Sequence, residues 1–401
     1  MKISKSLFLA FAGLGLFACS NEDVTTGVDN SGDNSIVIKL DGLSAEGRSI
    51  GAPETNTTTT ISDVAILLSD GTNILKKQVL SYDKSGDSDW SKLTGSNSGY
   101  IIHNVNSHVR EVHVIGNYTK NSTVSTWVTS AEQSTVAAMK DVVVKAASEQ
   151  DFDGVTLYGV DSELTTVAGG DANSPHDTDT PSKMLYADVT INHLVSRIEI
   201  GNIKCKDLGS TYKELTLKYI GLLNYYNQTT IGGTASDAMT LETVLEPTAG
   251  NATPAQGKHS WSNTSETADY KWAWDAFPAD AKLTSSSSVY NPEASPETED
   301  VTEKFVYQFI PSQVGGANFN VKLYLDAKEN NDAAATSALN TVTANFTGDS
   351  DFKYLPGKIY KLDFEFSEDN IGPWNPDETI CVKVHVTVAD WEIKTLTPTF
   401  E

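Results

Sequence analysis

Apolar and polar residues alternate along most of this chain, in short runs separated by clusters of Gly, Asp, Asn and Ser. A period of two is typical of β-strands, because successive side chains of a strand point to opposite faces of its sheet. The run ISDVAILLSDGTNILKKQVL, residues 61–80, contains two such strands around Asp70 and Gly71, a dipeptide that favours hairpin turns. The pattern therefore predicts a mostly β protein.

One segment has a helical period instead. Between Ala131 and Ala147 four apolar residues recur at the spacing of a helix face: Val136, Met139, Val143 and Ala146. The three consecutive valines at residues 142–144 disfavour a helix, because β-branched side chains lose rotational freedom there. We expect one helix in this segment and few, short helices elsewhere.

The length of 401 residues is enough for two domains. A polar stretch with Gly and Pro, residues 165–183, has the composition of a linker or a long surface loop. We place the domain boundary near Lys183. Six strand-like runs follow without an intervening helix, which predicts an antiparallel β-sandwich over residues 184–401. The preceding part, residues 49–183, is predicted to form another.

The first 19 residues have the features of an export signal. Two lysines precede an apolar run, residues 7–18, that is too short to span a membrane as a helix. This run ends in LFAC, which resembles the lipobox of bacterial lipoproteins, in which the cysteine becomes the lipidated first residue. We therefore predict a lipoprotein signal over residues 1–19 and lipidation, such as palmitate, at Cys19. An ordinary secretory signal is the alternative.

Charge and cysteine content narrow the possible partners. The formal net charge of -24 argues against nucleic acid, whose phosphates are bound by Lys and Arg. Beyond Cys19, only Cys205 and Cys381 remain, and an exported chain can pair them. Pairing requires a short distance between the two residues, which a sequence does not supply. The sequence therefore does not decide whether Cys205 and Cys381 form a disulfide.

The residues expected of a catalytic or metal site are absent. The seven histidines include no H-E-x-x-H motif and no zinc spacing with cysteine, and the acidic clusters lack the spaced ligands of a calcium loop. We expect no catalytic residues, no metal and no cofactor, so the chain is predicted not to be an enzyme. A hydrolase of surface glycans is the last alternative, because paired carboxylates are not recognisable in so acidic a sequence.

Two tryptophans offer a candidate binding site. Trp272 and Trp274, in KWAWD, fall on the same face of a predicted strand, as in a platform on which carbohydrate stacks. Large aromatic residues at a period of two are more often part of a sandwich core. Glycan contact through this pair is therefore the alternative to burial.

Several strand-like runs resemble the fimbrillins of Bacteroidetes, the subunits of type V pili. VTINHLVSRIEI, residues 189–200, is similar to the strand that opens their second domain, and LPGKIYKLDFEF and VKVHVTVADW look like their late strands. The chain most resembles the shaft subunit of the minor, short fimbriae. The resemblance implies two transthyretin-like β-sandwich domains and a structural pilus subunit for cell adhesion and biofilm formation. It also implies a lipid-anchored precursor in the outer membrane, followed by an extracellular fimbrium.

The partners that the resemblance implies are identical subunits, tip and anchor subunits, surface receptors and an Arg-specific extracellular protease. Such pilins are cut after an arginine, which removes the lipidated segment and the first strand. Among the three arginines, only Arg48 lies among small turn-forming residues, whereas Arg110 and Arg197 lie in alternating runs. The resemblance thus implies a cut between Arg48 and Ser49, and a propeptide over residues 20–48.

The removed strand would be SIVIKLDGL, residues 35–43, with Ile36, Ile38 and Leu40 on one face. Its loss leaves an apolar groove with unpaired backbone groups, which a partner strand can fill. The implied donor is the C-terminal tail of the next subunit. Its candidate residues are Ile393, Leu396, Pro398 and Phe400.

Alternatives remain for the tail and for the whole chain. The tail can instead be the last strand of the subunit's own sheet, followed by a frayed end. The chain can instead be a tip adhesin, a glycan-binding surface lipoprotein, or an anchor that keeps its lipid.

Overall fold

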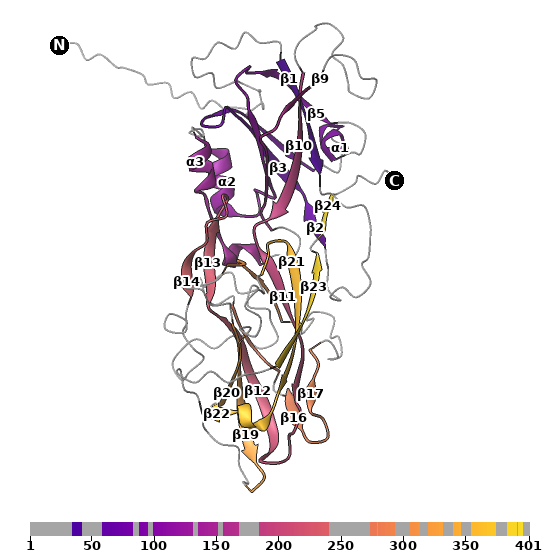
Figure 1. Ribbon diagram of the computed structural model, residues 1–401, viewed down its shortest axis with the longest axis vertical. Coiled ribbons are helices and arrows are strands. Elements are labelled where there is room, and N and C mark those ends of the chain that lie inside the picture. The colour runs from indigo at the N-terminus through magenta and orange to yellow at the C-terminus, as the bar shows by residue number, and fades with distance from the viewer. Residues whose placement is uncertain are drawn as a thin grey trace, which may run out of the picture.

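The computed structural model describes residues 34–41, 58–82, 88–94, 99–130, 135–150, 155–167, 184–239, 273–278, 280–292, 305–312, 320–331, 340–345, 354–373, 383–390 and 392–395. The molecule is elongated, and its strands fall into two groups that follow one another along the long axis (Figure 1). We call these groups the N-terminal unit and the C-terminal unit.

The N-terminal unit is built on one sheet of eight strands. Its order is β4-β3-β6-β8-β10-β1-β5, and β9 also pairs with β10. The strands are β1 (Asn34–Asp41), β3 (Asp63–Ser69), β4 (Ile74–Ser81), β5 (Tyr100–Val105), β6 (Glu111–Gly116), β8 (Leu157–Asp161), β9 (Thr165–Val167) and β10 (Met184–His193). The predicted hairpin at Asp70-Gly71 is confirmed, because β3 and β4 pair there and Gly71 has a φ of 95°.

This sheet is curled, so that its two edge strands approach each other. Lys76 in β4 donates a hydrogen bond from Nζ to the carbonyl oxygen of His103 in β5, at 2.9 Å. Helix α1 (Ser88–Thr94) packs against β1, β4 and β5 and buries Trp90 and Leu93. The opposite face of the sheet is covered by α2 (Ser122–Thr129) and α3 (Val136–Lys140), as Figure 1 shows.

The helix predicted over residues 131–147 is wrong in extent. Within the described residues, it is limited to α3, whose N-terminus is capped by Thr135 Oγ1 accepting from the Ala138 N–H at 3.1 Å. The segment then continues as β7 (Val143–Lys145) and a 3-10 turn, η1 (Ala146–Glu149). Val144 is fully buried in this strand. The β-branched valines disfavour a helix and fit well on a paired strand.

The C-terminal unit is a sandwich of two sheets. One has the order β17-β11-β21-β23 with β18 beside β11, and the other has the order β15-β12-β19-β20-β22 with β16 beside β12. Apolar residues of both sheets, such as Ile198, Leu217 and Leu323, are buried in one core. The strands are β11 (Ser196–Cys205), β12 (Tyr212–Leu223), β15 (Trp274–Ala276), β16 (Lys282–Thr284), β17 (Val289–Tyr290), β18 (Val306–Phe309), β19 (Asn320–Glu329), β20 (Asn340–Asn345), β21 (Lys358–Phe366), β22 (Gly372–Pro373) and β23 (Lys383–Asp390).

The fold is mostly β, as predicted, but the sheets are mixed rather than purely antiparallel. β1 runs parallel to β10, and β11 runs parallel to β21. Parallel neighbours require a long crossover connection. In both pairs, strands far apart in the sequence lie side by side, which local patterning does not reveal.

The change from one unit to the other differs from the boundary predicted near Lys183. β10 belongs to the first sheet, and β11 begins the second, so the chain changes sheets between His193 and Ser196. The polar stretch before Lys183 connects β9 to β10 within the N-terminal unit. The actual change lies in the apolar run HLVSRI, where composition gives no signal.

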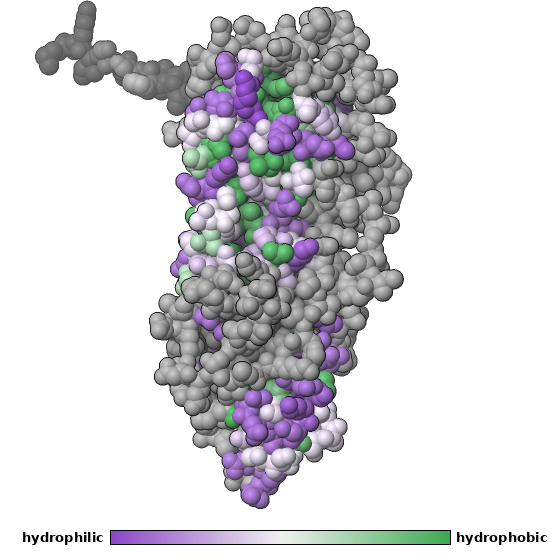
Figure 2. All heavy atoms as spheres, viewed as in Figure 1, coloured by the Kyte–Doolittle hydropathy of each residue, from purple (hydrophilic) through white to green (hydrophobic). Residues whose placement is uncertain are grey.

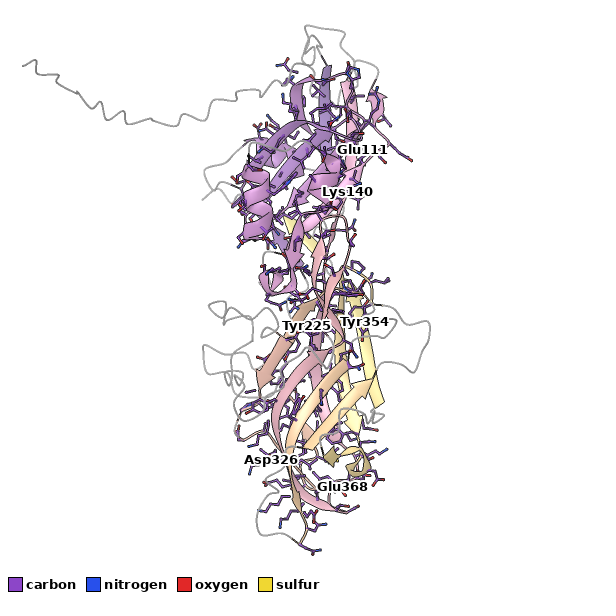
Figure 3. The ribbon with its side chains drawn as sticks, turned by 90° about the vertical axis from the view of Figure 1, so that its left-hand side faces the viewer. Glu111, Lys140, Tyr225, Asp326, Tyr354 and Glu368 are labelled. Carbon is purple, nitrogen blue, oxygen red and sulfur yellow. The ribbon has the colours of Figure 1, made fainter. Side chains whose placement is uncertain are left out.

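A small sheet and a buried glutamine join the two units. β7 pairs with β13 (Tyr225–Thr230), which pairs with β14 (Ser236–Met239). Gln150, 4% exposed, donates from Nε2 to the Gln308 carbonyl at 2.7 Å and accepts from the Gln308 N–H at 3.1 Å. Figure 3 shows Tyr225 and Tyr354 in this region, between the two units.

Replacing Gln150 with Ala is expected to weaken this joint. The change leaves buried backbone groups of Gln308 without their partner, which costs about 1–3 kcal/mol in the free energy of unfolding. Urea denaturation of the full chain measures the loss. Gln228→Ala is the matched control, because Gln228 is only partly buried and its amide contacts the Ser236 hydroxyl. Equal losses for both variants would contradict the role of Gln150.

Candidate functional site: the β1 slot and the C-terminal ribbon

β1 lies in the interior of the first sheet, between two strands that are distant in sequence. It pairs in parallel with β10, from Ser35 opposite Met184 to Asp41 opposite Thr190. On its other side it pairs antiparallel with β5, with Ile38 opposite Tyr100. We call the space that β1 occupies between β10 and β5 the β1 slot.

The residues that the sequence singled out in β1 all point into the core. Ile36 and Ile38 are fully buried and Leu40 is 4% exposed, as expected from the alternation of a strand. Burial of three such side chains is worth about 1.5–3 kcal/mol each. β1 is therefore strongly held, and its removal would expose a continuous apolar groove.

The two walls of the slot depend on β1 to different degrees. β10 also pairs with β8 and β9, whereas β5 is at the edge of the sheet and has its ladder with β1 alone among the described residues. The Ser35 hydroxyl adds a contact of 3.2 Å to Nδ1 of His103 in β5. A strand that replaced β1 would therefore have to hold β5 as well as bury its own apolar side chains.

The beginning of the C-terminal tail is paired within its own chain. β24 (Glu392–Thr395) runs parallel to β2 (Thr58–Ile61), with Ile393 opposite Thr59. Of the predicted donor residues, Ile393 thus lies in this two-stranded ribbon, in line with the alternative in which the tail pairs with its own subunit. Leu396, Pro398 and Phe400 lie outside the described residues. The valines of β23 pair with β21 in the subunit's own sheet.

His193 connects this ribbon to the joint between the units. It is 4% exposed at the end of β10, and its Nε2 lies 2.8 Å from the hydroxyl of Thr59 in β2. A side chain at Gly357, in the turn before β21, would contact the His193 ring at 3.4 Å. Burial lowers the pKa of His193 to about 3, so the ring is neutral. Sequence reasoning missed this residue, because a histidine within a strand carries no spacing signal.

Stability is expected to fall at mildly acidic pH because of His193. The unfolded chain takes up a proton near the ordinary pKa of 6.5, whereas the folded chain does so only near about 3. Stability is therefore highest above pH 6.5 and decreases as the pH falls toward 3, by about 2 kcal/mol between pH 7 and pH 5. Denaturation at both pH values measures this. His193→Gln, which keeps a hydrogen-bonding group, should remove most of the difference; an unchanged difference would assign it to other groups.

The arginines differ from expectation in one respect. Arg48 and Ser49 lie outside the described residues. Arg110 is not in a strand but is exposed in the turn before β6, so exposure does not single out Arg48. Its N–H donates to the Ser69 carbonyl at 2.7 Å, and its guanidinium donates to two carbonyl oxygens of the same turn. Arg110 thus holds the turn before it, and the next residue, Glu111, is paired with Ser69 in the sheet. Arg197 is 1% exposed in β11 and pairs with Glu199 at 3.0 Å.

For the possible cysteine pair and for the tryptophan pair, only one member of each lies within the described residues. Cys205 is a free, buried thiol whose pKa is raised by burial to about 12, and Cys381 and Cys19 lie outside the described residues. The Trp274 backbone pairs with Gly221 through β15, and its neighbour Asp275 is buried. Trp272 lies outside the described residues.

One partly buried polar cluster, which we call the Glu111 cluster, resembles a catalytic set in its residue types. His113 Nε2 lies 3.0 Å from a Glu111 oxygen, Tyr158 OH lies 2.9 Å from His113 Nδ1, and the Ser69 hydroxyl donates to Glu111 at 3.2 Å. Figure 3 places Glu111 near Lys140 of α3. Ser69 and His113 have no exposed surface, and Ser69 and Glu111 approach the same ring nitrogen, whereas a triad uses both. The cluster is therefore structural.

Other site types find no support in the described parts of the chain. No group of His, Cys, Asp and Glu is arranged to hold a metal ion among the described residues. No helix there is long and apolar enough to cross a membrane. On the face shown in Figure 2, hydrophobic residues occur among polar ones over the N-terminal unit, whereas the far end of the C-terminal unit is mostly hydrophilic.

Solved structures resemble this fold. No protein-family model and no curated protein matches the sequence. A candidate cell adhesion protein from Parabacteroides distasonis matches with a TM-score of 0.51 and 13% identity, over 90% of this chain and 97% of that chain. A candidate cell adhesion protein from Bacteroides eggerthii has a TM-score of 0.49 and 14% identity, over 91% and 98%. A fimbrilin from Porphyromonas gingivalis has a TM-score of 0.44 and 10% identity, over 91% and 99%. The Parabacteroides structure shows that the chain shares this fold over most of its length.

Proposed function

We propose that the chain is a structural subunit of surface fimbriae that polymerises by donor-strand exchange. The observation that carries the proposal is the place of β1: a strand near the N-terminus, with three buried apolar residues, pairs on both sides in the interior of the sheet. Its removal after Arg48 would create a groove that a strand of a second copy can fill. The fold that the chain shares with a candidate cell adhesion protein is consistent with this role.

Each step of the proposed assembly has a physical reason. Export as a lipoprotein through Cys19 brings the chain to the outer membrane, where β1 keeps the slot closed. Proteolysis between Arg48 and Ser49 then releases the lipid together with β1. An open sheet interior is unstable in water, so the tail of a second copy enters, and repetition of this head-to-tail contact gives an open filament. The filament is extracellular and serves adhesion and biofilm formation, with tip and anchor subunits at its ends.

The nature of the N-terminus tests the proposal. Mass spectrometry of the protein shed from the cell surface should find chains that begin at Ser49. A lipidated Cys19 on all chains would favour an anchor or a glycan-binding lipoprotein, and retention on glycan columns that is lost in Trp272→Ala or Trp274→Ala would identify the latter.

A further inference from the structure

One wall of the β1 slot lacks a side chain where β1 comes closest. Gly99 is buried directly before β5, and a Cβ added to it would overlap with Cγ1 of Val37 and lie 3.0 Å from the carbonyl oxygen of Ile38. Val37 is on the face of β1 opposite to Ile36 and Ile38, and it is still only 3% exposed. The slot therefore receives side chains on both faces of the strand that fills it.

The backbone does not require a glycine at this position. The glycines with a positive φ in the described residues are Gly71, Gly209, Gly233 and Gly357, and Gly99 is not among them. An alanine can adopt the conformation of Gly99 without strain. The overlap is with a branched, stiff side chain and with backbone, neither of which moves easily. The missing side chain of Gly99 is thus explained by contact with the strand in the slot.

The end of the chain repeats the pattern of β1 in the same direction. Residues 35–41 read SIVIKLD and residues 395–401 read TLTPTFE. Position by position, both have a hydroxyl residue, an apolar residue, a β-branched residue, an apolar residue, a polar residue, an apolar residue and an acid. Thr397 takes the position of Val37 in this alignment and has nearly the same shape.

The opposite direction fits less well. It would place Phe400 at the position of Ile36, which is fully buried opposite Ile102, where a larger side chain overpacks the core. In the direction of β1, Phe400 takes the position of Leu40, which lies past the last β5 pairing at Ile38 and Tyr100. Pro398 takes the position of Ile38 in either direction and gives up one hydrogen bond of the ladder.

Resting on the proposed function, we infer that residues 395–401 of a second copy enter the slot in the direction and register of β1, with Thr397 packed against Gly99. Gly99 is then the residue that determines which strand the slot accepts, through steric fit on the face away from the core. Thr395 must leave its pairing with Ile61 to take part, so the end of the β2–β24 ribbon opens when a joint forms.

The contact can first be measured in the uncut chain, where β1 itself fills the slot. Gly99→Ala should lower the melting temperature, and the same change should have a smaller effect in chains that carry Val37→Gly, which removes the overlapping side chain. Additive effects of the two changes would overturn the steric contact.

Filament formation then tests the register. Full chains carrying Val37→Gly, so that they fold with either residue at position 99, are cut after Arg48 by an Arg-specific protease, which also removes position 37. We expect Gly99→Ala to raise the critical concentration for polymerisation, measured by sedimentation, at least tenfold. Because each joint combines position 99 of one copy with position 397 of the next, adding Thr397→Gly to the same chain should restore most of the filament yield.

Two controls separate the possible failures. Thr399→Gly, combined with Gly99→Ala, should give no recovery; recovery with Thr399→Gly alone would overturn the direction, because the reversed strand places Thr399 at Gly99. Normal polymerisation of Gly99→Ala chains would overturn the contact and leave the filament function standing. If cut chains with Gly99 form no filaments at all, the proposed function itself fails.

Discussion

Chains with Arg48→Ala are expected to reach the cell surface as folded, lipidated monomers and to form no filaments. The three buried residues of β1 would then remain in the slot, so no second copy can enter it. Their burial of about 1.5–3 kcal/mol each makes spontaneous exchange of the intact strand unfavourable. Electron microscopy of shed and cell-bound material, together with the mass of the N-terminal fragment, measures the result.

Arg110→Ala is the matched control for this prediction. Arg110 is also exposed, but its turn is held by hydrogen bonds to Ser69 and to carbonyl oxygens of the turn itself. A protease needs an extended segment around its cleavage site, so this turn should resist cutting, and the control should form normal fibres. Normal fibres from Arg48→Ala chains would contradict cleavage after Arg48. Loss of fibres in Arg110→Ala chains instead would place the cleavage site after Arg110.

Deleting residues 396–401 is expected to produce chains that are exported, cut and folded but that end every filament they join. The deletion starts after Thr395 so that the ribbon of β24 with β2 is kept. Such a chain has a slot but no donor strand, and head-to-tail growth stops where it is incorporated. At one deleted chain in ten, the mean length should fall to about ten subunits, because growth of an open head-to-tail filament ends at the first chain that offers no donor. Filament lengths in electron micrographs of mixed subunits measure this.

A longer deletion serves as the control for folding. Removing residues 392–401 also takes away β24, so that β2 loses the only strand partner it has among the described residues. This variant should melt at a lower temperature than the shorter deletion, which should melt like the full chain. If filaments stay long with residues 396–401 deleted, the tail is not the donor. β23 is a poor substitute, because it pairs with β21 along its whole length.

Much of the secondary structure could be predicted from the sequence, because turn residues and the period of apolar residues act locally on the backbone. The β3–β4 hairpin follows from two strand-like runs and the turn chemistry of Asp70-Gly71, and the apolar face of β1 follows from Ile36, Ile38 and Leu40. The helix over residues 131–147 fails for a related reason. Helical spacing and β-branching conflict there, and pairing with β13, more than eighty residues away in the sequence, resolves the conflict in favour of a strand at β7.

The candidate site was predictable only in its parts. The sequence indicates that β1 and the C-terminal tail are strands, and the resemblance to fimbrillins suggests that one can replace the other. The sequence does not indicate that β10 and β5 enclose β1, that Gly99 lies against Val37, or that His193 contacts β2. Each of these contacts joins residues that are more than fifty positions apart.

The sequence by itself determined the local features of this protein: a mostly β chain, the apolar face of β1, the negative net charge and the signal-like N-terminus. These depend on neighbouring residues, whose spacing and charge act directly on the backbone that carries them. Only the tertiary structure decided the parallel pairing of β1 with β10, the position where the sheets change at residues 194–195, and the pairing of the tail with β2. A strand offers the same backbone hydrogen bonds to any neighbour, so its partner is selected by how the remaining side chains pack together.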